Sequence, residues 1–240
     1  ADLVEEIVRI HGIDNVPSTP LPRADGVAKP TATPLQKLER KVRRYAAARG
    51  LNEAINWSFI AEKEAAAFGG GAWILANPIS EDMKVMRPSL LPGLLSAAQR
   101  NMDRGASSVR LFEIGRRYLV EEERLTLGMV LAGDKASRGW ASGKVAKFDA
   151  YDVKAEVVAL LAAAGVATES LMVMGEAGAH FHPGQSATLR MGPKTALAAF
   201  GTLHPATAKA FDLDGAVMAA EIYLDAIPAK KSSGFMRPAF

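Results

Sequence analysis

Residues 86–115 read MRPSLLPGLLSAAQRNMDRGASSVRLFEIG, and this stretch decides the fold that we expect for the chain. Its first half carries apolar residues at the spacing of one helix face, namely Leu91, Leu94, Leu95, Ala98 and Met102. Ser89 is placed to cap this helix and Gly105 to end it. The apolar run at 109–114 then predicts a strand. The stretch therefore predicts a core helix packed on a core strand.

Strands are expected along most of the chain that follows. Residues 117–121 and 125–133 predict antiparallel neighbours joined by an acidic turn, and LTLGMVLAGD is apolar enough for a central strand. Further strands are expected at 170–175, 186–191, 195–203 and 217–224, and helices at 33–49, 149–165 and near 205. Because no regular crossover helices separate these strands, the sequence predicts an α+β fold. We expect one mostly antiparallel sheet flanked by helices.

The composition excludes several classes of chemistry. The 240 residues are 49% hydrophobic and 23% charged, with a formal net charge of +3, which permits an anionic partner without requiring one. The absence of cysteine excludes disulfides, thiolate catalysis and cysteine-bound zinc, and it fits a cytoplasmic protein. No apolar run approaches the length of a membrane span, so no membrane partner is expected.

The first residues, DLVEEIVRIH, predict a short amphipathic helix that carries an acidic cluster. Asp2, Glu5 and Glu6 are spaced so that their carboxylates share one side of this helix. Such a cluster suits a hard cation such as Mg²⁺, which prefers oxygen ligands. A solvated acidic helix terminus is the simpler explanation. Residues 12–32 are rich in proline and predict a linker.

Residues 33–49, TPLQKLERKVRRYAAAR, predict a helix with one apolar and one basic face. Thr33, Pro34 and Gln36 have the pattern of a capping box with proline at the first helical position. The stripe expected to be buried is Leu35, Leu38, Val42, Tyr45 and Ala46. The basic residues are Lys37, Arg40, Lys41, Arg43 and Arg44, set against Glu39. A face of this kind can bind nucleic acid, although more often it is simply solvated.

The next segment, EAINWSFI at 53–60, alternates in hydropathy and predicts a strand. Ile55, Trp57 and Phe59 would face the core. Residues 61–68 predict a short helix that is ended by the glycine run at 69–71, and residues 73–76 should return to the sheet.

The sequence carries none of the common catalytic motifs. The glycine run lacks the later glycine of a dinucleotide fingerprint and the Lys-Ser/Thr of a phosphate-binding loop. No Gly-x-Ser-x-Gly is present. His180 and His182 could place two imidazoles on one side of a strand, but no third metal ligand lies nearby in the sequence.

The order of several motifs is more specific than any one of them. They are DLVEEIVRIHGIDNVP, NPISEDMKVMRPSLLPGLL, RLFEIGRRY, FDAYDVKAEVVALL, HFHPGQSA, FGTLHPATAKAFDL and MAAEIYLDAI. Together they closely resemble the family of bacterial phenylalanine–tRNA ligase β subunits. The resemblance spans essentially the whole chain and keeps the family's order and approximate spacing.

The resemblance implies a domain organisation. Residues 1–17 would be the C-terminal remnant of a helical B5 domain, 18–32 a linker, and 33–227 a module with the class II aminoacyl-tRNA synthetase fold. Residues 228–240 would lead to a missing C-terminal anticodon-binding domain. In this module, residues 33–60 resemble motif 1, which builds subunit contacts, and residues 86–115 resemble the region of motif 2.

The resemblance also implies that the module is inactive, because the family's β subunit is a catalytically inert copy of the α subunit. Class II chemistry needs cations on the ATP phosphates, and the Gly-x-Gly-x-x-Arg of motif 3 is absent from this sequence. Glu113 lies in the motif-2-like strand without the usual Phe-Arg-x-Glu order. We therefore expect no ATP binding and no aminoacyl-adenylate formation. Arg87, Glu113 and Arg116 are interpreted as surface or interface contacts.

Partners and a metal follow from the same resemblance. Asp2, Glu5 and Glu6 match three ligands of a Mg²⁺ site whose fourth ligand, an upstream aspartate, lies outside the chain, so the fragment should hold Mg²⁺ weakly or not at all. ATP would be used by the catalytic α subunit. The chain would join that subunit in a cytoplasmic α2β2 heterotetramer that aminoacylates tRNA-Phe. An uncovered apolar contact surface predicts that the isolated fragment self-associates.

Two other functions remain open from the sequence. The chain could be a stand-alone tRNA-binding or other nucleic-acid-binding module that uses the basic face at 37–44. It could also be a degenerate but active class II-like ligase.

Overall fold

The computed structural model describes residues 1–22, 30–136, 139–140, 143, 145–175 and 177–229. The chain divides into two units, Ala1–Ala32 and Thr33–Phe240. The first unit contains helix α1 (Asp2–His11), as expected, and a 3-10 turn at Ile13–Asn15. The predicted linkers at 18–32 and 228–240 lie in part outside the described residues.

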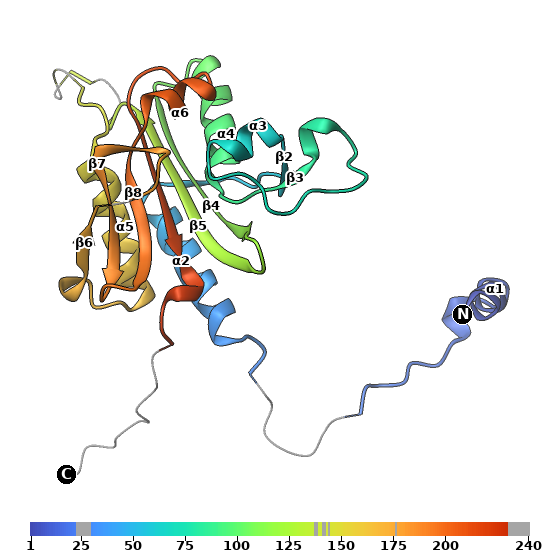
Figure 1. Cartoon of the computed structure of the whole chain (residues 1–240). Coiled ribbons are helices and arrows are strands. Elements are labelled where there is room, and N and C mark those ends of the chain that lie inside the picture. The colour runs from blue at the N-terminus through green and yellow to red at the C-terminus, as the bar shows by residue number, and fades with distance from the viewer. Residues whose placement is uncertain (23–29, 137–138, 141–142, 144, 176, 230–240) are drawn as a thin grey trace, which may run out of the picture. The chain divides into compact units, whose positions relative to one another are not determined.

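The second unit is built on a seven-stranded sheet with the strand order β1-β4-β5-β9-β8-β7-β6 (Figure 1). The strands are β1 (Asn52–Glu53), β4 (Ser108–Tyr118), β5 (Glu123–Gly133), β6 (Met172–Met174), β7 (Phe181–Met191), β8 (Thr195–Leu203) and β9 (Val217–Tyr223). All neighbouring pairs are antiparallel except β1 with β4. A small second sheet pairs β2 (Phe59–Ile60) with β3 (Val85–Met86).

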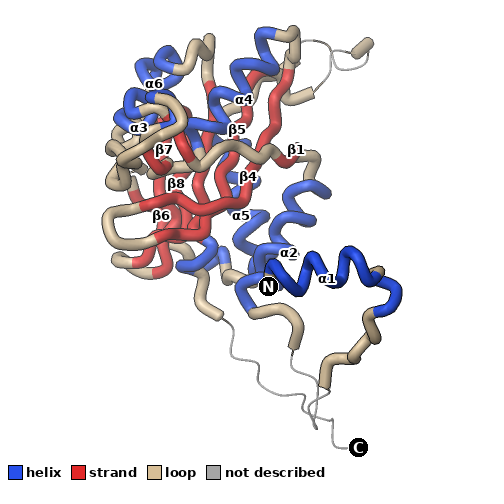
Figure 2. The backbone as a smooth tube through the Cα atoms, turned by 90° about the vertical axis from the view of Figure 1, so that its right-hand side faces the viewer, coloured by secondary structure: helices blue, strands red, loops and turns tan. Residues whose placement is uncertain are grey.

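Helices cover both faces of the large sheet. Helices α2 (Pro34–Ala48) and α5 (Ala150–Ala164) pack on one face, and Figure 2 shows them beside each other. Helices α4 (Leu91–Asp103) and α6 (Pro205–Ala210) contribute to the core on the other face, and α3 (Glu62–Ala66) lies in the chain between the two strands of the second sheet. The predicted α+β fold, an antiparallel sheet flanked by helices, is confirmed. No helix in the described part of the chain is long and apolar enough to cross a membrane.

The helix ends follow the local sequence signals. The Thr33 hydroxyl accepts a hydrogen bond from the Gln36 backbone N–H, and the Gln36 side chain accepts one from the Thr33 N–H, which forms the predicted capping box. Asp149 caps α5, and Gly165 ends it with a left-handed φ of 95°. These signals are local, so they fix the ends of helices without information from the rest of the fold.

The stretch at 86–115 folds as predicted, with small differences at the helix start. Leu91, Leu94, Leu95 and Ala98 are fully buried, and β4 follows the turn at Gly105. The helix begins at Leu91 with Leu90 at the cap position, while the Ser89 hydroxyl accepts a hydrogen bond from the Leu91 N–H.

The prediction of one strand at 53–60 is wrong. Only its two ends are strands, and they belong to different sheets. Ile55 and Trp57 are 92% and 70% exposed, because Asn56 points inward instead to bond a buried carboxylate. The expected return of 73–76 to the sheet is reduced to one bridge, between Ile74 and Val85.

The apolar stripe predicted for α2 is only partly buried. Val42 and Ala46 are fully buried, whereas Leu35 and Tyr45 are exposed. Hydropathy alone does not separate a side chain that packs on the sheet from one that stays uncovered beside it.

Candidate functional site on the α4 face of the sheet

Buried polar side chains gather on the face of the sheet that α4 covers. They are Arg87, Ser89, Glu113, Thr126 and Glu221. The core on the opposite face is mainly apolar, and the buried Glu156 of α5 is paired there with Arg49 and Arg110. Strand register places Glu113 of β4 opposite Gly128 of β5, and Gly128 opposite Glu221 of β9. Two acidic residues thus lie in one row across the centre of the sheet, with a glycine between them.

Glu113 forms a buried ion pair with Arg87. The distance from Arg87 Nη1 to Glu113 Oε1 is 2.6 Å, and Asn56 Nδ2 donates to Glu113 Oε2 at 2.8 Å. Arg87 Nε donates to the carbonyl of Arg116 at 3.0 Å. Each charge is therefore compensated, which is the condition for burying it.

The interpretation of Arg87 and Glu113 as surface or interface contacts is wrong. Their side chains are only 5% and 4% exposed, because the two charges neutralise each other inside the protein. Arg116 does lie at the surface, where its Nη1 is 2.8 Å from Glu123 Oε2.

Glu221 binds the start of α4. Its Oε1 accepts hydrogen bonds from the Ser89 hydroxyl and from the Leu90 N–H, both at 2.9 Å. A carboxylate at a helix N-terminus is favourable because the first N–H groups lack partners and the helix dipole is positive there. Gly128 leaves the space for this contact, since a Cβ on it would lie 2.8 Å from Leu90 Cβ. The row of Glu113, Gly128 and Glu221 thus holds residues 87–90 on the sheet.

A cavity of about 500 Å³ opens beside this row. It is lined by Phe68, Gly69, Gly70, Gly71, Ala72, Pro88, Ser89, Arg117, Tyr118, Leu119, Val120, His180, Glu221 and Tyr223. Arg117 is fixed in it, because its Nε donates to Thr126 Oγ1 at 3.0 Å and its Cζ lies 4.2 Å from the centre of the Tyr223 ring.

Burial sets the protonation of two groups that line this cavity. The pKa of Tyr223 is raised to about 12, mainly by desolvation and also by the charge of Glu221, against the opposing charges of Arg117 and Arg190. Desolvation lowers the pKa of His180 to about 4. The His180 ring packs against Phe68 and Phe181 at centroid distances of 4.8 and 4.5 Å. At neutral pH the cavity therefore presents a phenol hydroxyl, a neutral imidazole, a guanidinium and a carboxyl group.

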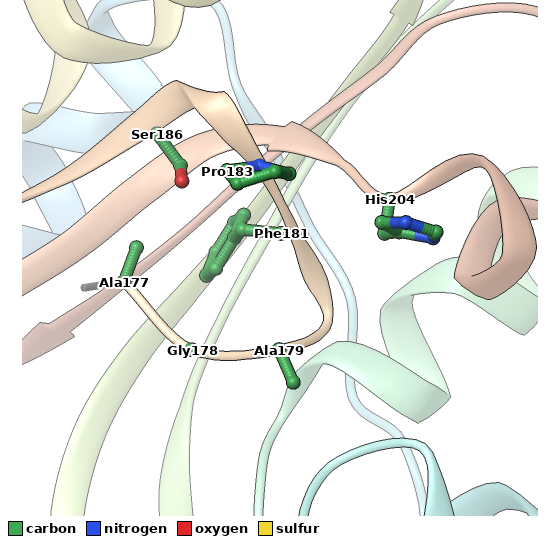
Figure 3. Close-up of a pocket in the computed structure, with 7 residues that line it drawn as sticks. All are labelled: Ala177, Gly178, Ala179, Phe181, Pro183, Ser186 and His204. Atoms are coloured by element: carbon green, nitrogen blue, oxygen red, sulfur yellow. The ribbon is translucent and has the colours of Figure 1, made fainter. Parts of the chain in front are cut away.

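A second cavity, of about 570 Å³, lies where β7 begins (Figure 3). The Phe181 ring lies between residues 177–179 and the side chains of Pro183 and Ser186. The polar side chains that line this cavity already have partners within the protein, since Ser186 Oγ donates to the carbonyl of His182 and His204 Nδ1 accepts from the Ala206 N–H. This cavity offers a ligand little beyond apolar contact.

The histidine pair considered for a metal does not form a site. His182 Nδ1 accepts a hydrogen bond from the Gly184 N–H, while His180 packs among aromatic rings. Within the described ranges, no group of three or more His, Asp or Glu side chains is placed to hold a metal ion.

Asp2, Glu5 and Glu6 all lie exposed on α1. Arg9 Nε donates to Glu6 Oε2 at 3.0 Å, so one of the three carboxylates already has a cationic partner. In the described part of the chain these three side chains do not form a metal site on their own. Their role as ligands stays a prediction.

The group formed by Arg117, His180, Glu221 and Tyr223 was not predicted. One signal was available, because Glu221 interrupts the apolar strand in MAAEIYLDAI. An acidic residue there must find buried partners. Which partners it finds depends on strand order, which single-sequence patterns do not give.

Comparison with known proteins identifies the family. The family model described as "Phenylalanyl tRNA synthetase beta chain CLM domain" matches residues 17–224. The phenylalanine–tRNA ligase β subunit of Novosphingobium aromaticivorans is 69% identical over 99% of this chain, and that of Zymomonas mobilis is 60% identical over 99%. The chain spans only 31% and 30% of those two relatives.

The solved structures confirm the fold. The crystal structure of pyrrolysyl-tRNA synthetase from Desulfitobacterium hafniense matches with a TM-score of 0.62 at 16% identity, over 80% of this chain and 67% of that one. At this identity the likeness concerns the fold alone, and it is that of a class II synthetase. With a family model that covers most of the chain and relatives of such high identity, the chain belongs to the phenylalanyl-tRNA synthetase β chain family.

Proposed function

We propose that the chain is the non-catalytic core of a phenylalanine–tRNA ligase β subunit, which contacts and braces the catalytic α subunit. The observation that carries this proposal is the exposure of Ile55 and Trp57 on a backbone segment that hydrogen bonds hold in place. Both lie in the motif-1-like segment, and both are largely exposed. Large apolar side chains that are exposed next to each other mark contact surfaces, whereas single exposed apolar residues are common on any protein.

Hydrogen bonds to the rest of the fold keep Ile55 and Trp57 exposed. Residues 54–58 are tied at both ends, by the Ala54 N–H to the Phe112 carbonyl at 2.8 Å and by the Arg87 N–H to the Ser58 carbonyl at 2.9 Å. Asn56 is fixed between them by its bond to Glu113. Gly93 of α4 gives Asn56 the room it needs, since a Cβ there would lie 2.7 Å from Asn56 Cβ. With Asn56 held inward, its two apolar neighbours must point outward.

Binding to the α subunit can be tested by co-expression of the chain with a candidate α subunit, followed by co-purification and a tRNA-Phe aminoacylation assay. Trp57→Ser and Ile55→Ser should weaken the complex and leave the fold intact, because both side chains contact mainly solvent. Val173→Ser is the matched control, since Val173 is 56% exposed on β6 at the opposite edge of the sheet from β1. A complex that tolerates the double variant as well as the control contradicts the proposal.

The non-catalytic part of the proposal rests on the α4 face. Leu90 packs over Gly128 at the centre of the sheet, and Arg87 is already paired with Glu113. The cavity beside them offers one arginine, Arg117, to an ATP triphosphate that needs several cations as charge builds on it. Titration calorimetry with ATP and a pyrophosphate-exchange assay of the chain alone should show neither binding nor exchange. Micromolar ATP binding contradicts this part.

The Mg²⁺ proposal concerns α1 alone. Asp2, Glu5 and Glu6 would bind Mg²⁺ only together with an aspartate supplied by the upstream part of a complete β subunit. Titration calorimetry should give weak or no Mg²⁺ binding to this chain and tighter binding to a complete β subunit. Tight binding to this chain contradicts the need for the fourth ligand.

A second candidate function, nucleic-acid binding, is favoured by one observation on α2. Glu39 and Glu53 both pair with Arg43, so the remaining cations of the helix have no acidic partner among the described residues. They are Lys37, Arg40, Lys41 and Arg44, all exposed at the spacing of one helix face. Titration with tRNA at two salt concentrations tests this function. Each phosphate contact adds about 0.7–0.9 to the steepness with which the logarithm of the affinity falls against the logarithm of the salt concentration.

A further inference from the structure

We propose that Asp214 is a modification site, at which the aspartate rearranges to isoaspartate through a cyclic imide with the backbone nitrogen of Gly215. This inference goes beyond the scaffold function and does not depend on it. It rests on an Asp-Gly pair in a turn that leaves both reacting groups exposed and without hydrogen-bond partners among the described residues.

The reaction needs only the chain and water. The Gly215 nitrogen attacks Cγ of the protonated Asp214 side chain, so that an N–Cγ bond forms and the amide hydrogen leaves with the side-chain hydroxyl as water. Closure of this five-membered imide is favoured because both reactants already belong to one chain. Water then adds to the main-chain carbonyl carbon of Asp214 and breaks its bond to the Gly215 nitrogen. The chain now runs through Cβ and Cγ, and the former main-chain carbonyl is a free carboxylate.

The turn at 214–216 connects two buried points of the fold. Leu213 is buried, as is Val217 at the start of β9, whereas the three residues between them are all exposed. The Asp214 carboxyl group makes no hydrogen bond or ion pair with a described residue. Neither burial nor a partner therefore keeps this carboxyl group away from the next backbone nitrogen or from water.

Gly215 presents the attacking nitrogen without cover. Its N–H makes no hydrogen bond with a described residue, although most backbone N–H groups in folded proteins have a partner. Its φ is 81°, in the left-handed region that glycine adopts readily, and a Cβ built on it would meet nothing within 4 Å. No side chain shields the nitrogen, and the open space around it leaves room for the rearranged backbone.

Asp212 lies in the same turn and is protected from the same reaction. It is also exposed, but the residue after it, Leu213, carries a buried side chain beside the nitrogen that would attack. The Leu213 N–H donates to the Ala208 carbonyl at 3.0 Å, and ring closure would break this bond. The loss of one such hydrogen bond accounts for up to about tenfold in rate.

The sequence sets Asp214 apart from the other described aspartates. It is the only one of them that a glycine follows. The second Asp-Gly pair of the chain, at 25–26, lies outside the described residues. Asp225 on the same stretch of chain is followed by Ala226 and pairs with Arg124 at 3.6 Å.

The test follows isoaspartate in the purified full chain during incubation at neutral pH and physiological temperature. Trypsin releases residues 210–230 as one peptide, which holds Asp212, Asp214 and Asp225, and electron-transfer fragmentation locates isoaspartate within it. Isoaspartate should accumulate about tenfold faster at Asp214 than at Asp212. Incubation in urea gives the rate without the fold, and the folded chain should convert Asp214 at a similar rate because the turn offers no protection. Equal accumulation at the two aspartates, or conversion of Asp214 roughly tenfold slower in the folded chain than in urea, overturns the proposal.

A pair of variants tests the site itself. Asp214→Glu should remove the isoaspartate of peptide 210–230, because a glutamate would have to close a larger ring. Asp212→Glu is the matched control, since it lies in the same turn, and it should leave the yield unchanged. The yield is measured as transfer of a methyl group from S-adenosylmethionine by an isoaspartyl methyltransferase to the isolated peptide. Circular dichroism and co-purification with the α subunit establish that both variants fold. If the Asp214→Glu peptide accepts as many methyl groups as the wild-type peptide, the site assignment is wrong even where the scaffold function holds.

Discussion

Glu113 and Arg87 carry opposite charges inside the protein, and each depends on the other. Removal of one partner leaves the other charge buried and uncompensated. We predict that Glu113→Ala lowers the free energy of unfolding by about 3–5 kcal/mol, measured by urea denaturation. The loss includes the bond from Asn56, so residues 54–58 should also become accessible to proteases.

Arg116→Ala is the matched control for this pair. The ion pair between Arg116 and Glu123 is 2.8 Å long, but it lies at the surface. Its loss should cost no more than about 1 kcal/mol, because solvent screens exposed charges. Replacement of both Arg87 and Glu113 by Met and Leu should recover most of the stability that Glu113→Ala loses. Equal effects of Glu113→Ala and Arg116→Ala would show that the buried pair is not special.

His180 gives the protein a predictable dependence on pH. Its pKa is about 4 in the folded chain and near 6.5 when unfolded, because burial disfavours the imidazolium. Between these values the unfolded chain binds more protons, so stability is fully present above pH 6.5 and is lost as the pH falls towards 4. We expect the wild type to lose roughly 2–3 kcal/mol from this group across that window.

The variant His180→Gln isolates this contribution. The free energy of unfolding of the wild type should fall by roughly 2–3 kcal/mol relative to that of the variant as the pH is lowered from 7 to 4.5, since the variant has no imidazole to protonate. Parallel profiles for wild type and His180→Gln would contradict the burial of a neutral imidazole.

The contact of α4 with the sheet depends on one missing side chain. A Cβ on Gly128 would lie 2.8 Å from Leu90 Cβ and 2.9 Å from Leu94 Cδ1, so Gly128→Ala must push the helix start away from the sheet. We predict a loss of about 1–3 kcal/mol in the free energy of unfolding. Gly175→Ala is the control, because a Cβ at Gly175 meets nothing within 4 Å. Equal stability of the two variants would contradict the close packing.

Elements whose ends are marked locally were predictable from the sequence. The Thr33 and Asp149 caps, the Gly105 turn and the apolar stripe of α4 each act within a few residues, and the structure reproduces them. The structure of the segment at 53–60 was not predictable in this way, although Ile55 and Trp57 do share one side of it. Alternation shows which residues share a side, but the side that faces inward depends on Glu113, far along the chain, which binds Asn56.

The same limit applies to the site. Glu221 could be singled out as an acid in an apolar strand, but its contact with Ser89 joins residues 132 positions apart. Arg117, Tyr223 and His180 come together only through the order β4-β5-β9-β8-β7. Motif order revealed the family because it uses the whole chain at once. It could not reveal a cavity that depends on packing.

The exposed motif-1-like surface leads to a prediction for the whole molecule. Ile55 and Trp57 are displayed rigidly on the isolated chain, and water is a poor solvent for them. In sedimentation velocity the chain should therefore self-associate as its concentration rises from micromolar to submillimolar. Trp57→Ser should shift this association to higher concentration, whereas Val173→Ser should not.

An added α subunit should replace the self-associated species with a heteromer, because both complexes would cover the same side chains. A chain that stays monomeric throughout, or one whose self-association survives in the α-subunit complex, would show that this surface is not the one being covered.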